Sequence, residues 1–501
     1  MSHRLIAWVA AAATLSLLGA QSPAAADASS VPEDRREGFA SIEASACEEW
    51  LTYLASDELG GRETGQPGYR LAAEYVAARF AEFGLEPVGD DGTFFQNVPF
   101  VSAGPTADSV LALVADDGTE ILRLIPGEDV GGRISEASEQ DLPIVDLLAQ
   151  SAADVEDADL EGKAVLFRDE SPALSRWTEA TRALWRARPK AILTIDDDGA
   201  SRVQRRVRMG SGRRSRVLSS RFRRPNTYVI STATAERIRE ELSARQGSLT
   251  LQVRVGMEER PAFGGNVVGM LRGSDPELQH EVVGVGSHLD HIGSSGGVIN
   301  NGADDDGSGT TGVLAVARAF SQNEVKPRRS ILFMCFSGEE KGLIGSGYYA
   351  DHPIVPHGDM VAELQMDMIG RREEKVRGGT VHESADDNAN SLHLIGTKKL
   401  SSALHELCLA VNDAHIGFDY EYDEEDVFTR SDHYNFAKQG IPIAFFFTGF
   451  HSQYHRPDDT VDKIDFPKLT RVARLVYLVA FELANADERP DVDGSWRPRR
   501  R

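Results

Sequence analysis

Residues 282–291 read VVGVGSHLDH, a run of small and apolar side chains that ends in two histidines and an aspartate. An apolar run without polar alternation is typical of a strand that is buried on both faces of a parallel sheet. In open α/β sheets, ligands bind beyond the carboxyl ends of the strands. The segment therefore predicts a strand at 282–286, with His288 and Asp290 where chemistry would take place.

The segments around this strand alternate between expected strands and expected helices. Buried strands are predicted at 266–271, 330–336, 362–366 and 443–447, and helices at 310–320, 400–411 and 469–484. A turn-rich stretch at 54–65 leads into another helix, in which apolar residues recur at helical spacing from Tyr69 to Phe80. This alternation predicts an α/β fold with a mixed, mostly parallel sheet that has helices on both faces.

Between about residues 105 and 255 the pattern changes to short β-like runs separated by turn residues. The runs are 109–114, 164–167, 191–195, 227–230 and 249–255. They predict a smaller β-rich domain, placed at 125–248, between an N-terminal part (27–124) and a main part (249–488) of the larger domain. Ten arginines lie between Ser201 and Arg224. We interpret this stretch as a solvated surface loop, with anion or partner binding as the alternative.

Length, charge and the two ends of the chain limit the possible functions. The 501 residues favour two or three domains, and the net charge of −24 argues against a nucleic-acid partner. Arg4, the apolar run 5–18 and Ala24–Ala26 predict a signal peptide at 1–26, and therefore export to the periplasm or the medium. We expect no membrane anchor, because no later stretch is apolar enough. The basic tail at 489–501 is expected to fray.

Acidic residues and histidines follow the expected strands. The candidate metal ligands are His288, Asp305, Glu340, Asp367 and His455, and Asp305 lies in the glycine-rich acidic loop 302–309. Imidazole and carboxylate ligands without a thiolate indicate Zn²⁺, with Co²⁺ or Mn²⁺ as substitutes. Five ligands are too many for one tetrahedral zinc that keeps an open position. The sequence therefore predicts two Zn²⁺ ions that share one carboxylate.

Taken together, the motifs resemble those of the M28 family of zinc peptidases, which includes bacterial aminopeptidases and glutamate carboxypeptidase. They are HLD (288–290), GADDDGSG (302–309), FSGEEKG (336–342), MDMIG (366–370), SDH (431–433) and YHRPDDT (454–460). The resemblance implies that Glu340, His455 and Asp305 bind one zinc, and that His288, Asp367 and the same Asp305 bind the other. The β-rich insertion resembles the protease-associated (PA) domain that some members carry.

The resemblance also implies roles for residues beside the ligands. Glu339 would be the general base for attack by a hydroxide that bridges the two metals, and Tyr454 would stabilise the oxyanion. Asp290 would orient the His288 ring, and the peptide bond between Asp305 and Asp306 would be cis. Asp306 is expected beside the ligands. His433 is expected either in the substrate pocket or packed in the core. His291 and His451 are expected next to the site but outside the ligand positions.

These expectations favour an exported di-zinc aminopeptidase that acts on peptides. A carboxypeptidase or dipeptidase on the same scaffold is the alternative, because the sequence does not identify the residues that would hold a free amine or a free carboxylate. A non-catalytic, receptor-like binding protein is a third interpretation. Such a protein should have lost a ligand or the base, whereas this chain keeps all of them. The oligomeric state is left open, with a homodimer as one alternative.

Overall fold

The computed structural model describes residues 28–126, 129–133, 137–147, 155, 158–167, 183–184, 186–196, 214–217, 226–245, 248–295, 298–377, 380–422, 425–494 and 496. The predicted signal peptide lies outside these residues. Most of the arginine-rich stretch and the end of the basic tail lie outside them as well.

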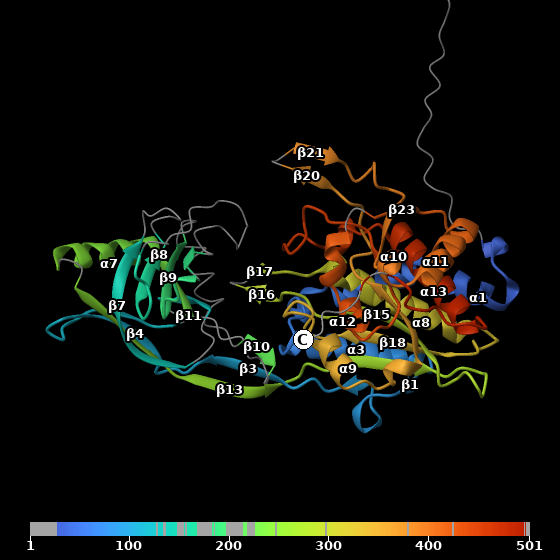
Figure 1. Cartoon of the computed structure of the whole chain (residues 1–501), viewed down its shortest axis with the longest axis horizontal. Coiled ribbons are helices and arrows are strands. Elements are labelled where there is room, and N and C mark those ends of the chain that lie inside the picture. The colour runs from blue at the N-terminus through green and yellow to red at the C-terminus, as the bar shows by residue number, and fades with distance from the viewer. Residues whose placement is uncertain are drawn as a thin grey trace, which may run out of the picture.

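A mixed sheet forms the centre of the larger unit (Figure 1). Among the described residues it has nine strands, in the order β1-β14-β18-β15-β19-β24-β22-β23, with β2 paired to β14. Their bounds are β1 (Glu86–Pro87), β2 (Phe95–Gln96), β14 (Asn266–Leu271), β15 (Val282–His288), β18 (Ser330–Phe336), β19 (Met360–Met366), β22 (Ser391–Ile395), β23 (Asp419–Glu421) and β24 (Ile443–Phe447). The four central strands, β18, β15, β19 and β24, are parallel. The predicted α/β sheet is therefore confirmed.

Side chains of the central strands alternate between two cores, one on each face of the sheet. On β18, Ile331 and Phe333 face one core, whereas Leu332 and Met334 face the other. Because successive side chains of a strand point to opposite faces, such a strand has to be apolar throughout. This is why these segments could be recognised as continuous apolar runs.

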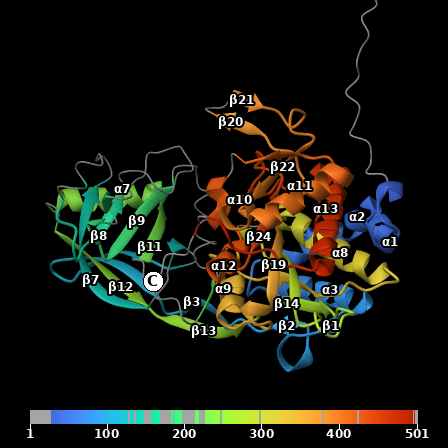
Figure 2. The same cartoon turned by 45° about the vertical axis from the view of Figure 1, so that its right-hand side comes forward.

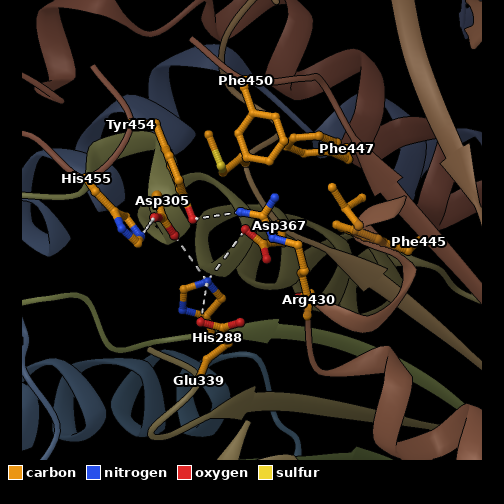
Figure 3. A pocket seen from close by; sticks show the side chains of 13 residues that line it. His288, Asp305, Glu339, Asp367, Arg430, Phe445, Phe447, Phe450, Tyr454 and His455 are labelled. Atoms are coloured by element: carbon orange, nitrogen blue, oxygen red, sulfur yellow. Dashed lines mark hydrogen bonds and ion pairs between the residues drawn. The ribbon is translucent and has the colours of Figure 1, made fainter. Parts of the chain in front are cut away.

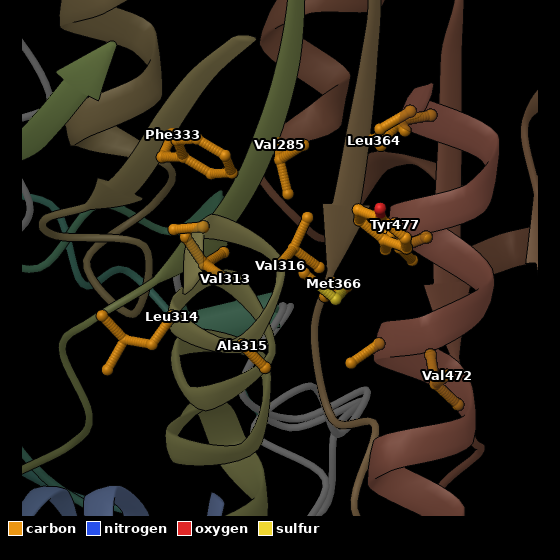
Figure 4. Close-up of a cluster of buried hydrophobic side chains, with 14 of the residues drawn as sticks. Val285, Val313, Leu314, Ala315, Val316, Phe333, Leu364, Met366, Val472 and Tyr477 are labelled. Atoms are coloured by element: carbon orange, nitrogen blue, oxygen red, sulfur yellow. The ribbon is translucent and has the colours of Figure 1, made fainter. Parts of the chain in front are cut away.

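Helices cover both faces, as predicted. On one face, α8 (Gly309–Gln322) and α13 (Phe466–Asn485) pack against β15, and Val285, Val313 and Val472 belong to the shared core (Figure 4). The helices α1 (Glu33–Ser41), α2 (Ala44–Leu54), α3 (Pro67–Glu82) and α11 (Ser402–His415) add to this layer. On the other face lie α9 (Ile344–Asp351), α10 (Thr397–Leu400) and α12 (His433–Lys438).

A second, β-rich unit has its own sheet and core. Among the described residues its eight strands follow the order β5-β4-β12-β7-β8-β9-β11-β6, and α7 (Thr232–Ala244) packs on them. The strands are β4 (Val110–Ala115), β5 (Glu120–Leu124), β6 (Gly131–Arg133), β7 (Ser138–Leu147), β8 (Ala164–Phe167), β9 (Ala191–Asp196), β11 (Asn226–Ser231) and β12 (Leu249–Val255). This sheet includes strands on both sides of the interval 125–248. The domain boundaries and the likeness to a PA domain stay predictions.

The chain enters and leaves the β-rich unit through one antiparallel ribbon. Its two strands are β3 (Phe100–Pro105) and β13 (Met257–Ala262), and β10 (Arg214–Val217) pairs with the outer side of β3. The amide of Thr106 donates to the carbonyl of Gly256 at 3.0 Å, which joins the two chain segments where the ribbon ends. Figures 1 and 2 both show this ribbon between the two units.

Two further features of the described residues concern membranes and thiols. Over the part of the chain that the structure describes, no helix combines the length and the apolar character needed to cross a bilayer. The three cysteines, Cys47, Cys335 and Cys408, all lie in that part and are buried and unpaired. Burial raises the pKa of each thiol to about 12, so none of them has the character of a nucleophile.

Candidate metal centre

The five predicted ligands meet at the carboxyl ends of the central strands (Figure 3). His288 ends β15, Asp367 directly follows β19, and Glu340 lies in the turn after β18. His455 lies in the loop after β24, and Asp305 lies in the turn that begins α8. Parallel strands bring their carboxyl ends to one edge of the sheet, so residues more than 160 positions apart in the sequence become neighbours there.

Asp305 lies between two pairs of side chains. Its Oδ1 atom is 3.3 Å from Nε2 of His288, and that nitrogen is 3.5 Å from Oδ1 of Asp367. Its Oδ2 atom is 3.0 Å from Nε2 of His455, which is 3.1 Å from Oε1 of Glu340. Oδ1 of Asp305 therefore faces the histidine of the first pair, and Oδ2 faces the histidine of the second. This is the arrangement expected of a ligand shared by two ions.

The residues of this site fit zinc. Oδ2 of Asp305 and Oε1 of Glu340 are buried, and neither receives a hydrogen bond from the described residues. A buried carboxylate oxygen without a donor is costly unless a cation balances it. Imidazole nitrogens and carboxylate oxygens are ligands that zinc accepts in open catalytic sites. The buried charge and the donor set thus both agree with two Zn²⁺ ions.

The comparison with protein families concerns the C-terminal part of the chain. Residues 266–480, which contain all five predicted ligands, match the model of peptidase family M28. These residues form an M28 peptidase domain. The predicted resemblance is therefore confirmed at the level of the family.

Curated relatives of the chain are fungal peptidases. A probable leucine aminopeptidase of Arthroderma benhamiae is 29% identical over 252 residues, which cover 46% of this chain and 65% of the relative. Leucine aminopeptidase 1 of Coccidioides posadasii is 30% identical over 223 residues, which cover 42% of this chain and 55% of the relative. The chain therefore spans less than two thirds of the length of either relative.

Solved structures share the fold of the whole chain. An aminopeptidase from Aneurinibacillus sp. strain AM-1 has a TM-score of 0.57 at 22% identity, covering 93% of this chain and all of that one. BSAP, a zinc aminopeptidase from Bacillus subtilis, has a TM-score of 0.58 at 19% identity, covering 90% of this chain and 98% of that one. At such identities the likeness establishes the fold.

The acidic turn of the M28 domain directs three consecutive carboxylates to different partners. Asp305 faces the ligand histidines, and the peptide bond to Asp306 is cis, as the resemblance implied. Asp306 accepts hydrogen bonds from the amides of His288, Gly309 and Met368 at 2.8–3.1 Å. Asp306 therefore ties the end of β15 to the start of α8 and to the segment after β19. Asp304 accepts a hydrogen bond from the amide of Gly370 at 2.7 Å.

Asp290 and Glu339 lie beside the ligands. The carbonyl oxygen of Asp290 lies 3.0 Å from Nδ1 of His288, whereas its carboxylate accepts a hydrogen bond from the amide of Glu339 at 3.0 Å. The main chain of Asp290 thus holds the His288 ring, and its side chain holds the turn that carries Glu339. Burial raises the pKa of Asp290 to about 6 and that of Glu339 well above its usual range.

A pocket opens next to the ligands. Its metal-side wall contains His288, Asp305, Asp367, His455 and Glu339. The other lining residues are mostly apolar and form what we call the apolar wall, Met368, Val427, Phe445, Phe447 and Phe450, with Ser431, Tyr454 and Arg430 as polar neighbours. Figure 3 shows the three phenylalanines on the side of the pocket away from His455. Sequence reasoning missed Arg430 and this wall, because Phe445 and Phe447 lie in β24 whereas the other wall residues come from separate segments.

Tyr454 and His433 occupy different places with respect to this pocket. Tyr454 lines it, stacks on His455 with 3.9 Å between the ring centroids, and lies 3.5 Å from a guanidinium nitrogen of Arg430. Burial raises the pKa of Tyr454, so its hydroxyl keeps its proton at neutral pH. His433 lies behind the wall, stacked on Phe445, with Nε2 2.8 Å from the carbonyl oxygen of Phe428. Burial lowers the pKa of His433 to about 3.

Two more histidines lie close to the ligands, as the sequence suggested. His451 lies with Nε2 3.2 Å from Oδ2 of Asp304, on the far side of the acidic turn. His291 lies with Nδ1 2.9 Å from Oε1 of Glu340. The sequence placed both outside the ligand set. The spacing of His288, Asp290 and His291 at the end of a single strand was the available indication that His291 lies beside Glu340.

Proposed function

We propose that the chain is a zinc aminopeptidase that releases N-terminal residues from peptides. The position of Asp305 between a His288–Asp367 pair and a His455–Glu340 pair carries the proposal. Bound there, zinc ions would polarise the peptide carbonyl and make a water molecule acidic at neutral pH. The naming of curated relatives as leucine aminopeptidases supports the choice among peptidases.

Glu339 is the group that moves the proton. It lines the pocket, and its Oε2 atom lies 4.0 Å from Nε2 of His288. In that position it takes a proton from the attacking water and returns it to the nitrogen of the leaving amine. Its neighbour Glu340, in the turn after β18, points to His455 instead.

The apolar wall indicates the substrate class. Three phenylalanines, Phe445, Phe447 and Phe450, line the pocket together with Met368. Such a wall stabilises an apolar side chain by removing it from water, at about 25 cal/mol per Å² of buried apolar surface. We therefore propose that peptides with a large apolar first residue are the preferred substrates.

Metal removal tests this function. We expect about two zincs per chain in the purified protein by metal analysis, and hydrolysis of leucine p-nitroanilide that is lost with a chelator and restored by added zinc. Zinc-free protein that still cleaves the substrate, or protein that never holds zinc, would refute the proposal. Co²⁺ and Mn²⁺ are expected to restore activity in part, since both accept the same donor atoms.

One observation favours the alternative activity, that of a carboxypeptidase or dipeptidase. The guanidinium of Arg430 lines the pocket and can pair with a free carboxylate. Peptides blocked at the amino end and free at the carboxyl end distinguish the two activities. Cleavage of these peptides, without cleavage of free-amine substrates, would replace the aminopeptidase proposal.

Tyr454 is proposed to donate a hydrogen bond to the oxyanion. Its hydroxyl lies at the pocket and keeps its proton at neutral pH because of burial. Tyr454→Phe removes this donor but keeps the ring on His455, so kcat should fall by about 10²-fold with little change in KM. Steady-state kinetics on leucine p-nitroanilide measure both, with Tyr75→Phe in α3 as a control expected to match the unchanged chain. An unchanged kcat in Tyr454→Phe would show that Tyr454 only packs.

We also propose that the protein acts outside the cytoplasm. The apolar run at 5–18 and the three alanines at 24–26 support export. The N-terminal sequence of the protein isolated from the medium or the periplasm tests this. It is expected to begin after Ala26.

A further inference from the structure

His291 is a buried imidazole whose surroundings supply no ordinary hydrogen bond. The residue is fully buried, and neither of its ring nitrogens has a hydrogen-bond partner in the described part of the chain. A buried polar group without a partner costs about 1 to 3 kcal/mol unless something else satisfies it. The two ring nitrogens of His291 therefore favour a further partner, such as a metal ion.

The atoms that Nδ1 of His291 faces are the ligand atoms of one metal position. It lies 2.9 Å from Oε1 of Glu340 and 3.7 Å from Oδ2 of Asp305. Nε2 of His455 lies 3.0 and 3.1 Å from Oδ2 of Asp305 and Oε1 of Glu340. Ligand atoms about 2.1 Å from a tetrahedral zinc are separated by about 3.4 Å, so these four atoms have the spacing of one coordination shell.

The backbone is built to hold the ring in this position. The amide of His291 donates to the carbonyl of Arg62 at 3.3 Å, which fixes the start of the side chain. Gly302 has a φ of +59°, and a Cβ atom at that position would lie within 2.6 Å of two ring carbons of His291. A glycine is therefore required there both by the backbone conformation and by the ring.

The pocket distinguishes the two metal positions. His288 and Asp367 line it, whereas Glu340 and His291 are not among the described residues that do. Glu340 and His291 thus lie behind the pocket wall, whereas His455, whose side chain is 37% exposed, lines the pocket together with His288 and Asp367. Structural zinc sites have four protein ligands, whereas catalytic sites keep one position open.

We propose that His291 is a sixth protein ligand of the metal centre and completes a set of four with His455, Glu340 and Asp305. The set formed by His288, Asp367 and Asp305 then has three protein ligands. The inference rests on the proposed di-zinc function, since it concerns a ligand of one of those ions. It predicts unequal affinities, because the zinc with four protein ligands is held more tightly and the zinc with three is lost first.

His291→Asn tests the inference without any measure of activity. The Asn amide reaches the place of Nδ1 and keeps a polar group there, but it is a poor zinc ligand. Zinc is titrated against a chromogenic chelator, with His451→Gln as the matched buried-histidine control. A lost hydrogen-bonding partner weakens metal binding by about 10- to 100-fold, so a lost ligand should weaken one site by more than about 100-fold.

The outcomes separate this inference from the proposed function. Two zincs in the unchanged chain and in His451→Gln, with one site weakened in His291→Asn, support it. Wild-type affinity at both sites in His291→Asn overturns it and leaves the di-zinc function standing, whereas a wild-type chain without zinc overturns both. Zinc X-ray absorption on the unchanged protein is independent of variant folding. Three imidazoles shared by two zincs support the inference, and two overturn it.

Discussion

Replacing Glu339 with glutamine should lower kcat by about 10²- to 10⁴-fold, the range for loss of a general base. The substitution keeps the size of the side chain and its hydrogen-bonding backbone amide, but the amide group cannot take up a proton. Because Glu339 lines the pocket without belonging to either ligand pair, zinc content and KM should change little. Steady-state kinetics and metal analysis of the same preparation measure both effects.

Glu74→Gln is a suitable control for this experiment. Glu74 lies in α3, far along the chain from the ligands, where it pairs with the exposed Arg70 at 2.9 Å. This variant should keep wild-type kcat and two zincs. If Glu339→Gln kept more than about a tenth of the activity, or lost zinc, Glu339 would not be the base.

Arg62→Leu should have the largest effect on stability. Arg62 is 1% exposed, and its guanidinium donates to the carbonyls of Leu54, Leu289, Asn301 and Gly302, the last three at 2.7–2.9 Å. It thereby joins the end of α2 to the segment after β15 and to the loop that leads to Asp305. Four buried carbonyls without a donor cost about 1 to 3 kcal/mol each, so at least roughly 4 kcal/mol should be lost.

Thermal unfolding of the zinc-loaded protein measures this loss. A destabilisation of that size lowers the midpoint by roughly 10 °C in a domain of 150–250 residues. Arg70→Leu in α3 is the matched control, because its side chain is exposed and its ion pair contributes less than about 1 kcal/mol. Equal midpoints for the two variants would mean that loop carbonyls near Asp305 find other donors.

The central strands and the five ligands could be predicted for the same physical reason. A strand buried on both faces must be apolar throughout, and polar side chains at its carboxyl end then stand out, as His288 does at the end of β15. Strand β22 gave no such pattern, because His393 interrupts it, although the residue is buried in the fold. Strand β7 begins with four polar residues and has Pro143 in its middle, so its sequence is typical of a loop.

The rest of the site depends on tertiary contacts that no local pattern encodes. The apolar wall combines Phe445 and Phe447 of β24 with residues from separate segments. Val427 faces the same pocket because α12, which follows it in the chain, packs on β24. The sequence placed His291 beside the ligands but could not give its distance to Glu340, because that distance depends on how the turn after β18 folds back. Asp306 gave no sign in the sequence that its partners would be three backbone amides.

The single ribbon of β3 and β13 has a consequence for how the gene can change. The chain leaves the larger unit along β3 and returns along β13. The amide of Thr106 then donates a hydrogen bond to the carbonyl of Gly256. The residues between these two positions therefore form one inserted segment whose two ends lie next to each other. A short turn between these positions would keep β3 paired with β13 and the strands of the larger sheet in register. Acquisition, exchange or deletion of the β-rich unit would therefore leave the predicted ligands in place.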